Sequence, residues 1–488
     1  MIDVSRTFQA NEILITGANG FVGKVALAML LARYPEAARV HVLVRPRRGV
    51  SAQQRFEDEV LASPVFQPFD REGFAERIVV HEGDAAELGD EAAQAMAGVK
   101  LIIHCAGLVE FFAPVDESLR ANVDAVEKVA DLAGRIGAKL LHVSTCYVAG
   151  RGNGLVEESQ LIEGFYPLRK DCNDMAFDAQ TEIAKLRERI GELNAQGRDG
   201  TAQRALIELG RSRAERWGWV NTYTYTKSLG EQTLAARSDI EWAIVRPAIV
   251  ESALEFPFPG WVEGGRTAAP LVLMALGGMS EWPARGDLSL EVVPVDQIAA
   301  AMLGVAALLA EGKADRVYQL AVSDRNPFPM RRLIALLAAE AKRRGAQVGG
   351  DPKLFDGQTY VQRNRRQKAR VEKLERRFQA LSKWLKSKGL PGSGAAARKS
   401  GQMRQAALQL RFREQTVEQY LPFTEQNRYV FEANHIRMAM AELSDGDRAR
   451  LPWTPESIDW PSYWRDNEIE GVLKWVQPDA VRDWSFQL

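Results

Sequence analysis

The sequence predicts an α/β fold built on a doubly wound parallel sheet, with a helical insertion and a mostly helical C-terminal domain. Short apolar runs alternate with helical stretches, which is the pattern of a parallel sheet covered by helices on both faces. A glycine-rich turn joins the first run to the first helix, and two strongly charged helical segments interrupt the alternation later in the chain. At 488 residues the chain is long enough for two or three domains.

The predicted strands share a short length and an apolar or β-branched composition. In chain order they are Glu12–Thr16, Arg39–Val44, Ile78–Val80, Leu101–His104, Leu140–Val143 and Trp242–Val245. Helical stretches such as Phe21–Leu31 and Val115–Arg135 separate most of them. We therefore predict one domain over residues 1–335 and a second, helical domain over residues 336–488.

The first interruption, over about residues 160–217, is predicted to be a helical insertion. Its second part, Asp178–Trp217, is rich in charge but carries apolar residues at helical spacing, among them Ile183 and Leu186. The insertion is interpreted either as a lid or flank of the functional site or as a solvated pair of surface helices.

The second interruption, residues 361–413, is a basic segment. It contains sixteen Lys or Arg residues but only two acidic residues, Glu372 and Glu375. Apolar residues share one predicted helical face beside lysines, namely Leu374, Phe378, Leu381, Trp384 and Leu385. This pattern fits an interfacial helix at a membrane surface or a docking face for an acidic partner. It equally fits a helix that packs on its own domain and leaves a basic side in water.

The composition indicates the class of protein and bears on nucleic acid and metal binding. With 46% hydrophobic and 26% charged residues, the chain has the composition of an ordinary globular protein. Its 63 basic residues nearly balance 64 acidic ones, so we expect no nucleic acid partner. Cys105, Cys146 and Cys172 cannot form a disulfide framework and lack metal-binding spacing, so no metal is expected.

The sequence also bears on location. We expect no signal peptide, because the first residues lack a basic region followed by an apolar stretch. The longest apolar runs, such as Ala268–Met279, are shorter than the roughly 20 residues of a membrane span. We expect a cytoplasmic protein, and peripheral membrane contact through the basic segment stays open. The oligomeric state is not predicted.

The glycine-rich turn predicts a dinucleotide site and a Rossmann-type fold. The sequence TGANGFVG lies between the first strand and the first helix, which is the context that such a turn requires. Glycines let the backbone approach a pyrophosphate, whose charge lies at the helix N-terminus. The residues expected to contact the cofactor here are Thr16, Gly17, Asn19, Gly20, Phe21, Val22 and Gly23.

The end of the second strand indicates which dinucleotide binds. An acidic residue there would hold a ribose 2′-hydroxyl, but the sequence has Arg45, Pro46, Arg47 and Arg48. Arginine can bind a 2′-phosphate, so NADPH is the predicted cofactor, through Arg45 and Arg48. Further contacts are expected near adenine, along the fourth strand and beside the nicotinamide, from Asp84, Ala106, Gly107, Lys227, Pro247 and Ile249.

A tyrosine four residues before a lysine occurs twice, as Tyr166–Lys170 and Tyr223–Lys227. The first pair contains Pro167, whereas the second opens an amphipathic helix that a strand follows directly. Residues four apart share one helical face, so Tyr223 and Lys227 are expected to point into one cleft. A neighbouring ammonium is expected to lower the pKa of the phenol toward neutrality.

A hydroxyl at the end of the fifth strand is expected to stabilise negative charge on a substrate carbonyl. Ser144 and Thr145 both qualify on position alone. With Tyr223 and Lys227 they would form a set of groups suited to carbonyl reduction by hydride transfer.

These motifs resemble those of the fatty acyl-CoA reductases, a group of extended short-chain dehydrogenase/reductases. TGANGFVGK, HVSTCYVAG, NTYTYTK, RPAIV, PFPGW and VPVDQ appear in the order typical of that family, over about residues 10–330. A second match lies near the carboxyl end and resembles the helical C-terminal domain of these reductases. It comprises Tyr429–Phe431, Asn434, Leu443–Asp447, Ser457–Trp460 and Tyr463.

The resemblance implies a reaction and roles for residues. Thr145, Tyr223 and Lys227 take the catalytic positions, and Ser144 lies beside the substrate. The implied reaction is NADPH-dependent reduction of a long-chain acyl-CoA or acyl carrier protein thioester to an aldehyde, and on to a primary fatty alcohol of the kind found in wax esters. Aromatic residues are candidates for the wall of an acyl channel or, alternatively, for core, namely Phe111, Phe112, Phe256, Phe258 and Trp261.

Two other functions stay open on the sequence. One is an extended short-chain dehydrogenase that acts on a sterol or a sugar nucleotide, which would release no thiol. The other is a non-catalytic NADP-binding regulatory protein. The presence of Thr145, Tyr223 and Lys227 argues against the second, because a protein that only binds the cofactor needs none of them.

Overall fold

The computed structural model describes residues 1–171, 173–195, 197, 200–265, 267–346 and 350–476. Cys172 lies outside them. The chain forms two compact units, and neither is continuous in sequence. Unit 1 comprises Met1–Glu263, Glu291–Pro327 and Tyr429–Tyr463. Unit 2 comprises Gly264–Leu290, Phe328–Arg428 and the described residues from Trp464 on.

A seven-stranded parallel sheet forms the centre of unit 1, in the order β11-β7-β5-β4-β1-β2-β3. Its strands are β1 (Glu12–Thr16), β2 (Val40–Val44), β3 (Ile78–Glu82), β4 (Val99–His104), β5 (Lys139–Val143), β7 (Trp242–Pro247) and β11 (Val317–Leu320). The strand order reverses between β1 and β4, where a doubly wound sheet opens a crevice for a ligand. This confirms the predicted fold class. Strand β11 is an addition that the sequence analysis did not predict.

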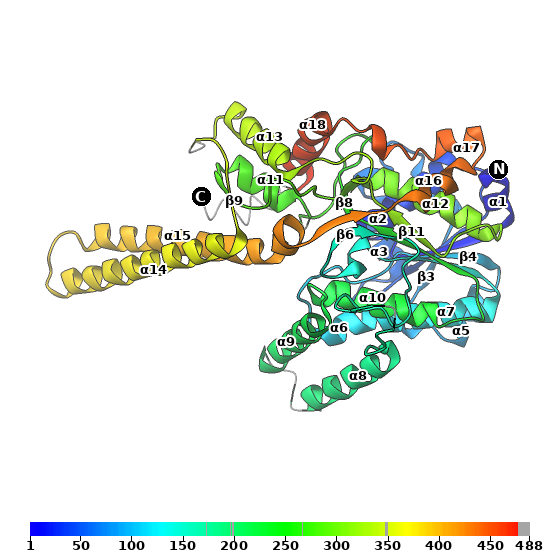
Figure 1. Cartoon of the computed structure of the whole chain (residues 1–488), viewed down its shortest axis with the longest axis horizontal. Helices are drawn as coiled ribbons and strands as arrows, with labels where there is room; N and C mark the ends of the chain where they lie inside the picture. The colour runs from blue at the N-terminus through cyan, green and yellow to red at the C-terminus, as the bar shows by residue number, and fades with distance from the viewer. Residues whose placement is uncertain (172, 196, 198–199, 266, 347–349, 477–488) are drawn as a thin grey trace. The chain divides into compact units, whose positions relative to one another are not determined.

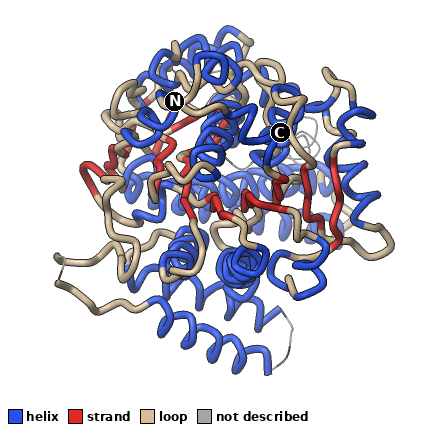
Figure 2. Tube along the Cα trace, turned by 90° about the vertical axis from the view of Figure 1, so that its right-hand side faces the viewer, coloured by secondary structure: helices blue, strands red, loops and turns tan. Residues whose placement is uncertain are grey.

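Helices cover both faces of this sheet (Figures 1 and 2). On one face α2 (Phe21–Arg33) packs against α12 (Val295–Ala310), and on the other α7 (Ala125–Ile136) packs against α10 (Thr222–Ala235). The strands are apolar on both sides because both sides are buried, as expected for a parallel sheet. In one core cluster Leu14, Ile102, Leu140 and Ile244 from four adjacent strands meet the apolar side of α7.

The remaining helices of unit 1 are shorter or lie outside these layers. They are α1 (Val4–Ala10), α3 (Ala52–Phe56), α4 (Arg71–Glu76), α5 (Asp90–Ala95), α6 (Val115–Leu119), α16 (Asn434–Ala441), α17 (Asp445–Arg450) and α18 (Trp460–Ser462). Two small sheets complete the unit. One joins β6 (Asn153–Val156) to β13 (Arg428–Phe431), and the other joins β8 (Ile249–Glu251) to β10 (Val292–Pro294).

The predicted insertion contains two helices, α8 (Ala179–Ala195) and α9 (Gly200–Trp217). Their apolar residues are not solvated, because Ile183, Leu186 and Leu206 are buried in one cluster with Tyr225 and Leu229 of α10. Glu182 accepts a hydrogen bond of 2.5 Å from the Tyr225 hydroxyl. The insertion therefore supports the helix that carries the predicted catalytic pair.

The two units differ from the predicted consecutive domains, 1–335 and 336–488. Residues 429–463 belong to unit 1, because β13 pairs with β6 and α16 packs against β11 and α12. The Tyr463 hydroxyl donates a 2.8 Å hydrogen bond to the Ser252 carbonyl. Residues 264–290 lie within the predicted first domain, but they belong to unit 2.

Unit 2 is mostly helical. Its elements are α11 (Ala269–Leu276), β9 (Glu281–Pro283), α13 (Met330–Arg343), β12 (Lys353–Phe355), α14 (Gly357–Ser387) and α15 (Ser393–Leu421). The basic segment 361–413 forms most of α14 and α15. Across the described residues of both units, no helix combines the length and the apolar character that crossing a bilayer requires.

Candidate active site

The glycine turn closes tightly after β1. Gly17 has a φ of +75°, and a Cβ built on it would lie 2.6 Å from the Ala106 nitrogen, so only glycine fits. A Cβ on Gly23 would lie 2.3 Å from the Gly17 carbonyl oxygen. Gly20 precedes the first residue of α2, and Phe21 and Val22 form its first turn. The backbone can therefore approach a pyrophosphate at the start of α2.

Side chains around the turn hold its two flanks together. The Ala106 amide donates a 3.3 Å hydrogen bond to Thr16 Oγ1. Asn19 donates a 3.3 Å hydrogen bond to Glu59, a carboxylate that Arg55 also binds at 2.9 Å. Sequence analysis did not find Glu59, because it lies outside any motif and reaches Asn19 only through the fold.

The arginines after β2 are exposed, as a 2′-phosphate site requires. Arg45 lies 3.5 Å from Asp84, whose carboxylate also binds Arg120 at 2.9 Å. Asp84 additionally accepts a 3.0 Å hydrogen bond from the Ala86 amide. The Asp84 carboxylate therefore already has two cationic partners, and its contact with adenine stays a prediction. Arg48 is exposed, and no salt bridge involves it within the described part of the chain.

Further residues expected to contact the cofactor follow β4 and end β7, namely Gly107 on the adenosine side and Pro247 and Ile249 on the nicotinamide side. A Cβ on Gly107 would lie 3.0 Å from Asn122 Oδ1 and 3.9 Å from Lys227 Nζ. Pro247 ends β7 and is buried, and Ile249 begins β8 and is half-buried. Gly107 thus brings the cofactor crevice next to the predicted catalytic lysine.

Tyr223 lies in the first turn of α10, and Asn221 begins that helix. The Asn221 side chain accepts a 2.8 Å hydrogen bond from the Thr224 amide, which is a standard N-cap. Asn122 lies beside the helix and donates a 3.0 Å hydrogen bond to Thr226. These contacts fix the direction in which Tyr223 and Lys227 leave the helix.

The structure brings Thr145 and Tyr223 together, because the Thr145 hydroxyl is close enough to the phenol to lower its pKa. Ser144 and Thr145 are the two residues that follow β5 on the chain. Thr145 Oγ1 accepts a 3.3 Å hydrogen bond from the Tyr147 amide. Its hydroxyl proton can then be donated to the Tyr223 oxygen. Ser144 is also buried, but its hydroxyl has no hydrogen-bond partner among the described residues.

The expected lowering of the pKa of Tyr223 is wrong for this structure. Burial raises the pKa of Tyr223, and the nearby Thr145 hydroxyl only partly opposes this. Lys227 does not act on the phenol, because its ammonium donates a 2.7 Å hydrogen bond to the Val143 carbonyl. Tyr223 is therefore a neutral phenol at neutral pH, the form that can donate a proton.

Lys227 itself is buried, and burial lowers the pKa of its ammonium to about 8. His142 Nε2 lies 3.3 Å from Lys227 Nζ. Burial and the nearby ammonium hold the pKa of His142 well below its usual value, so the ring is neutral and its Nε2 accepts from Lys227. His142 is a further residue of the site that sequence reasoning missed.

His142 belongs to a row of polar groups across the carboxyl ends of three strands. His104 pairs with His142 in the β4–β5 register, and their rings stack with centroids 5.3 Å apart. His104 Nδ1 lies 2.7 Å from Thr16 Oγ1, and burial lowers the pKa of His104 to about 3. The row thus links the glycine turn to Lys227. The sequence offered one signal for this row, namely a histidine at or next to the end of each of two predicted strands, His104 and His142.

Cys105 and Phe111 also lie near these groups. Cys105 is not an activated thiol, because burial raises its pKa to about 11. Phe111 lies beside the site, with its ring centroid 6.1 Å from that of Tyr223. Its carbonyl also accepts a 3.1 Å hydrogen bond from the Thr222 amide. Phe111 is therefore placed where an acyl wall would be.

Phe256 has other neighbours, and its assignment to the acyl wall or to the core stays a prediction. Its ring lies 4.8 Å from the Arg33 guanidinium carbon and 5.5 Å from the Phe69 ring. Arg33 ends α2, about 15 Å along the helix from Gly23. The Phe256 amide is held by the Asp296 carboxylate at 3.0 Å. Phe258 and Trp261 pack edge to face with each other in the same loop, and their role stays a prediction.

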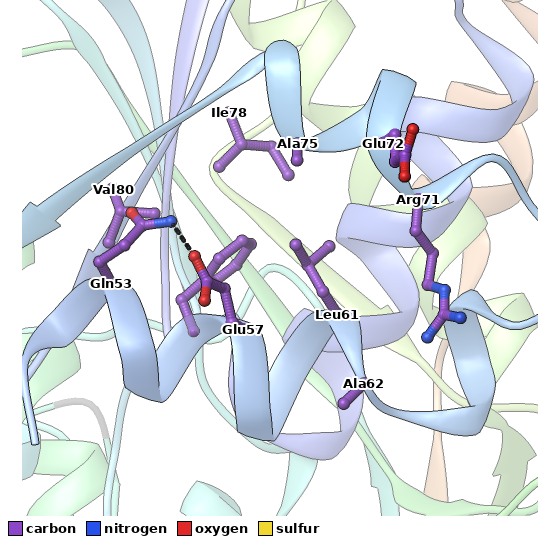
Figure 3. A pocket seen from close by; sticks show the side chains of 10 residues that line it. Gln53, Glu57, Leu61, Ala62, Arg71, Glu72, Ala75, Ile78 and Val80 are labelled. Carbon is purple, nitrogen blue, oxygen red and sulfur yellow. Dashed lines mark hydrogen bonds between the residues drawn. The ribbon is translucent and has the colours of Figure 1, made fainter.

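A pocket of about 410 Å³ lies at the edge of the sheet, between β3, α3 and α4 (Figure 3). Ile78 and Val80 line it together with Phe56 and Leu61, and Gln53 bonds Glu57 at its rim. Four strand spacings, about 19 Å, separate β3 from the strand that leads to Thr145. This pocket is therefore not part of the site around Tyr223.

Comparison with known proteins gives the family. A family model described as "Male sterility protein", of the NAD-binding kind, matches residues 15–302. The "Probable fatty acyl-CoA reductase 4" of Arabidopsis thaliana is 31% identical over 349 residues, which cover 67% of this chain and 70% of that protein. The chain belongs to the fatty acyl-CoA reductase family.

Two further comparisons agree with this assignment. The "Fatty acyl-CoA reductase 2, chloroplastic" of A. thaliana is 27% identical over 96% of this chain and 78% of its own length. The "Alcohol-forming fatty acyl-CoA reductase" of Simmondsia chinensis is 30% identical over 52% of this chain and 54% of its own length. Members of this family are NAD(P)-binding oxidoreductases, and the chain is one of them.

A solved structure supports the fold alone. The terminal R domain from the myxalamid PKS-NRPS biosynthetic pathway matches with a TM-score of 0.56 and 18% identity. The match covers 88% of this chain and 84% of that one. It therefore extends beyond the parallel sheet into the remainder of the described structure.

Proposed function

We propose that this reductase converts long-chain fatty acyl thioesters, carried by CoA or by acyl carrier protein, to fatty aldehydes and then to primary alcohols, with NADPH. The observation that carries the proposal is the pair of neighbouring hydroxyls, Thr145 and Tyr223, with the buried Lys227 ammonium on the same helix as Tyr223, in a member of the fatty acyl-CoA reductase family. The names of the relatives from A. thaliana and S. chinensis support the acyl-CoA substrate and the alcohol product.

The residues present fit a bound dinucleotide. Gly17 and Gly23 form a cradle that a Cβ would fill, and Gly107 leaves space toward Lys227. Arg45 and Arg48 are the cations placed to bind a 2′-phosphate, which supports NADPH over NADH. When bound, NADPH supplies the hydride for each of the two reductions.

In the first reduction, Thr145 and Tyr223 donate hydrogen bonds to the thioester carbonyl oxygen. They stabilise the negative charge that develops there as the carbonyl carbon gains a hydride. The product of this addition is a hemithioacetal. Its hydroxyl proton comes from Tyr223. When the C–S bond breaks, this proton passes to the sulfur, the carbonyl reforms as an aldehyde, and the carrier leaves as a thiol.

In the second reduction, the aldehyde oxygen takes the same position. Tyr223 is a neutral phenol in the free protein, so it can give its proton to the alkoxide and complete the alcohol. Lys227, fixed by Val143 and His142, keeps a positive charge near the site below a pH of about 8. Each reduction consumes one proton, which Tyr223 must regain from solvent.

The experiment that tests this proposal measures three products together. Purified protein is incubated with palmitoyl-CoA and NADPH, and NADPH oxidation, free thiol and lipid products are followed. We expect thiol release equal to the acyl-CoA consumed and two NADPH oxidised for each alcohol formed. NADPH oxidation without thiol release would favour a different carbonyl substrate. No acyl-dependent oxidation with CoA or carrier-protein substrates would contradict the proposal.

Cofactor choice is tested separately. Arg48→Ala removes a charge-assisted contact to the 2′-phosphate, and we expect the KM for NADPH to rise about tenfold or more while that for NADH stays constant. Arg39→Ala provides an exposed control, outside the turn that follows β2. Equal changes for both cofactors would contradict the role of Arg48.

A further inference from the structure

Helices α14 and α15 form an antiparallel hairpin in unit 2 (Figure 1). Side chain to backbone hydrogen bonds join the two helices along their length. Asn364 donates to the Leu410 carbonyl at 2.8 Å, and Ser382 donates to the Ser393 carbonyl at 2.8 Å. Ala407 and Leu410 are buried between the helices. The hairpin is therefore a defined structure with its own seam, and its other faces remain available.

Charge is divided unevenly along this hairpin. Near its base, acidic partners neutralise the cations: Arg363 lies 3.1 Å from Glu281, and Arg365 and Lys368 both bind Glu414. Ser400 donates a hydrogen bond to the Glu375 carbonyl, so residues 376–400 form the distal half, and they contain no Asp or Glu. Lys383, Lys386 and Lys388 are exposed there, and no salt bridge within the described residues involves them. The distal half is a cationic surface without internal neutralisation.

The same half exposes large apolar side chains. Trp384 is 53% exposed and Leu381 is 43% exposed, three residues apart on α14. Leu390, in the turn after the helix, is 44% exposed. Lysines alternate with these residues from Lys383 to Lys388. Apolar side chains flanked by lysines, whose aliphatic stems reach past them, are the pattern of an interfacial helix.

Three occupants are conceivable for this surface. A second copy of the hairpin is unfavourable, because two distal halves without acidic residues repel each other. An acidic protein would supply the charge, but a stable protein interface buries about 800 Å² on each side, far more than three apolar side chains at a hairpin tip offer. An anionic lipid surface requires only inserted apolar side chains and opposite charge.

We propose that the distal half of the α14–α15 hairpin, residues 376–400, binds anionic lipid surfaces by inserting Leu381, Trp384 and Leu390 while the lysines contact lipid headgroups. The inference does not depend on the proposed reaction. If that reaction holds, the hairpin also brings the reductase to the place where long acyl chains and fatty alcohols accumulate.

The test is cosedimentation of the full-length protein with vesicles. We expect binding to an equal mixture of phosphatidylcholine and phosphatidylglycerol, loss of binding at high salt, and no binding to phosphatidylcholine alone. The double variant Lys383→Glu/Lys386→Glu is expected to lower the partition coefficient by about tenfold or more, because each basic residue contributes to attraction by the surface. Leu381→Ser/Trp384→Ser is expected to lower it as well.

Matched controls carry the same changes on exposed residues of unit 1. Arg39→Glu/Lys185→Glu repeats the charge reversal, and Leu161→Ser/Met175→Ser repeats the loss of exposed apolar groups. Both controls should bind vesicles like the unchanged protein. Circular dichroism and thermal unfolding show whether each variant folds.

Three outcomes would overturn the proposal. One is vesicle binding that the hairpin variants leave unchanged, and another is equal loss in the unit 1 controls. The third is binding of purified acyl carrier protein that the hairpin variants abolish, without any binding to vesicles. Because sedimentation needs no turnover, a protein inactive toward acyl-CoA still gives an answer.

Discussion

The chain contains a tyrosine four residues before a lysine twice, and the structure gives the two pairs opposite surroundings. Tyr223 and Lys227 lie on α10, where the tyrosine meets Thr145 and the lysine is buried beside His142. Tyr166 packs between Phe177 and Trp217, with ring centroids at 5.8 and 5.3 Å, and Lys170 is exposed. Only the first pair shares a helix.

The difference shows what the short pattern requires to become a site. Spacing sets direction only on a helix, and Pro167 lies in a segment without helix between Tyr166 and Lys170. The helix of Tyr223 begins at a capping asparagine and is supported by the insertion behind it. Chemistry then depends on neighbours that come from other strands, namely Thr145, Val143 and His142.

The largest difference between the pairs is expected from removing each phenol oxygen. Tyr223→Phe deletes the proposed proton donor, which the proposed mechanism also uses to bind the carbonyl oxygen, so we expect kcat with palmitoyl-CoA to fall about 10²- to 10⁴-fold. Tyr166→Phe is the control and should leave kcat within twofold, roughly the scatter of such single changes. Similar losses in both variants would mean that the two tyrosines are not distinguished as the structure places them.

The next effect separates the two hydroxyls at the end of β5. Thr145→Val keeps the side-chain volume but removes the hydroxyl beside Tyr223, which the proposed mechanism uses to bind the substrate oxygen, so kcat should fall about 10²-fold. Ser144→Ala removes a hydroxyl that has no partner within the described structure, and its effect should be several-fold smaller. A larger loss for Ser144→Ala would reverse the assignment. Initial rates of NADPH oxidation measure both.

A smaller effect is expected in the pH dependence of the reaction. Lys227 is charged below its pKa of about 8 and becomes neutral as the pH rises through that value. We therefore expect kcat/KM to decline above a pH of about 8, because the positive charge that supports the site is lost. In Lys227→Arg the guanidinium stays charged, so any remaining activity should decline only at higher pH. An unchanged profile in Lys227→Arg would assign the decline to another group.

The smallest effect is expected at the exposed lysine of the other pair. Lys170→Met should leave kcat, the KM for acyl-CoA and the pH profile unchanged, and should move the thermal unfolding midpoint by about 2 °C or less. A substantial loss of activity would show that this segment contacts substrate or product. The same assay on Lys185→Met, another exposed lysine of unit 1, is the matched control.

Sequence analysis could predict features that are local or that repeat along the chain. The alternation of strands and helices, the TGANGFVG turn and the position of Tyr223 and Lys227 on one helix are of this kind. The row of Thr16, His104 and His142 depends on the order of strands in the sheet, which a linear pattern does not contain. Whether the pKa of Tyr223 is raised or lowered depends on the burial of its side chain and on the group to which the Lys227 ammonium donates its hydrogen bond.

The boundary between the units could not be predicted for a related reason. Strand β13 pairs with β6, more than 270 residues earlier in the chain, and no composition shift marks residue 429. The surroundings of Phe256 could not be predicted from the sequence for the same reason. Its neighbours in sequence include the PFPGW motif, but Asp296 holds its backbone beside the end of α2.

The pairing of β13 with β6 also bears on how the protein is made. During translation, the first 263 residues leave the ribosome long before residues 429–463 are synthesised. Until then, the edge of β6 in unit 1 has no strand paired with it. An uncovered strand edge invites pairing with other chains. Fragments that stop before residue 429 should therefore be aggregation-prone, and supplying residues 429–463 as a separate peptide would be the direct way to rescue them.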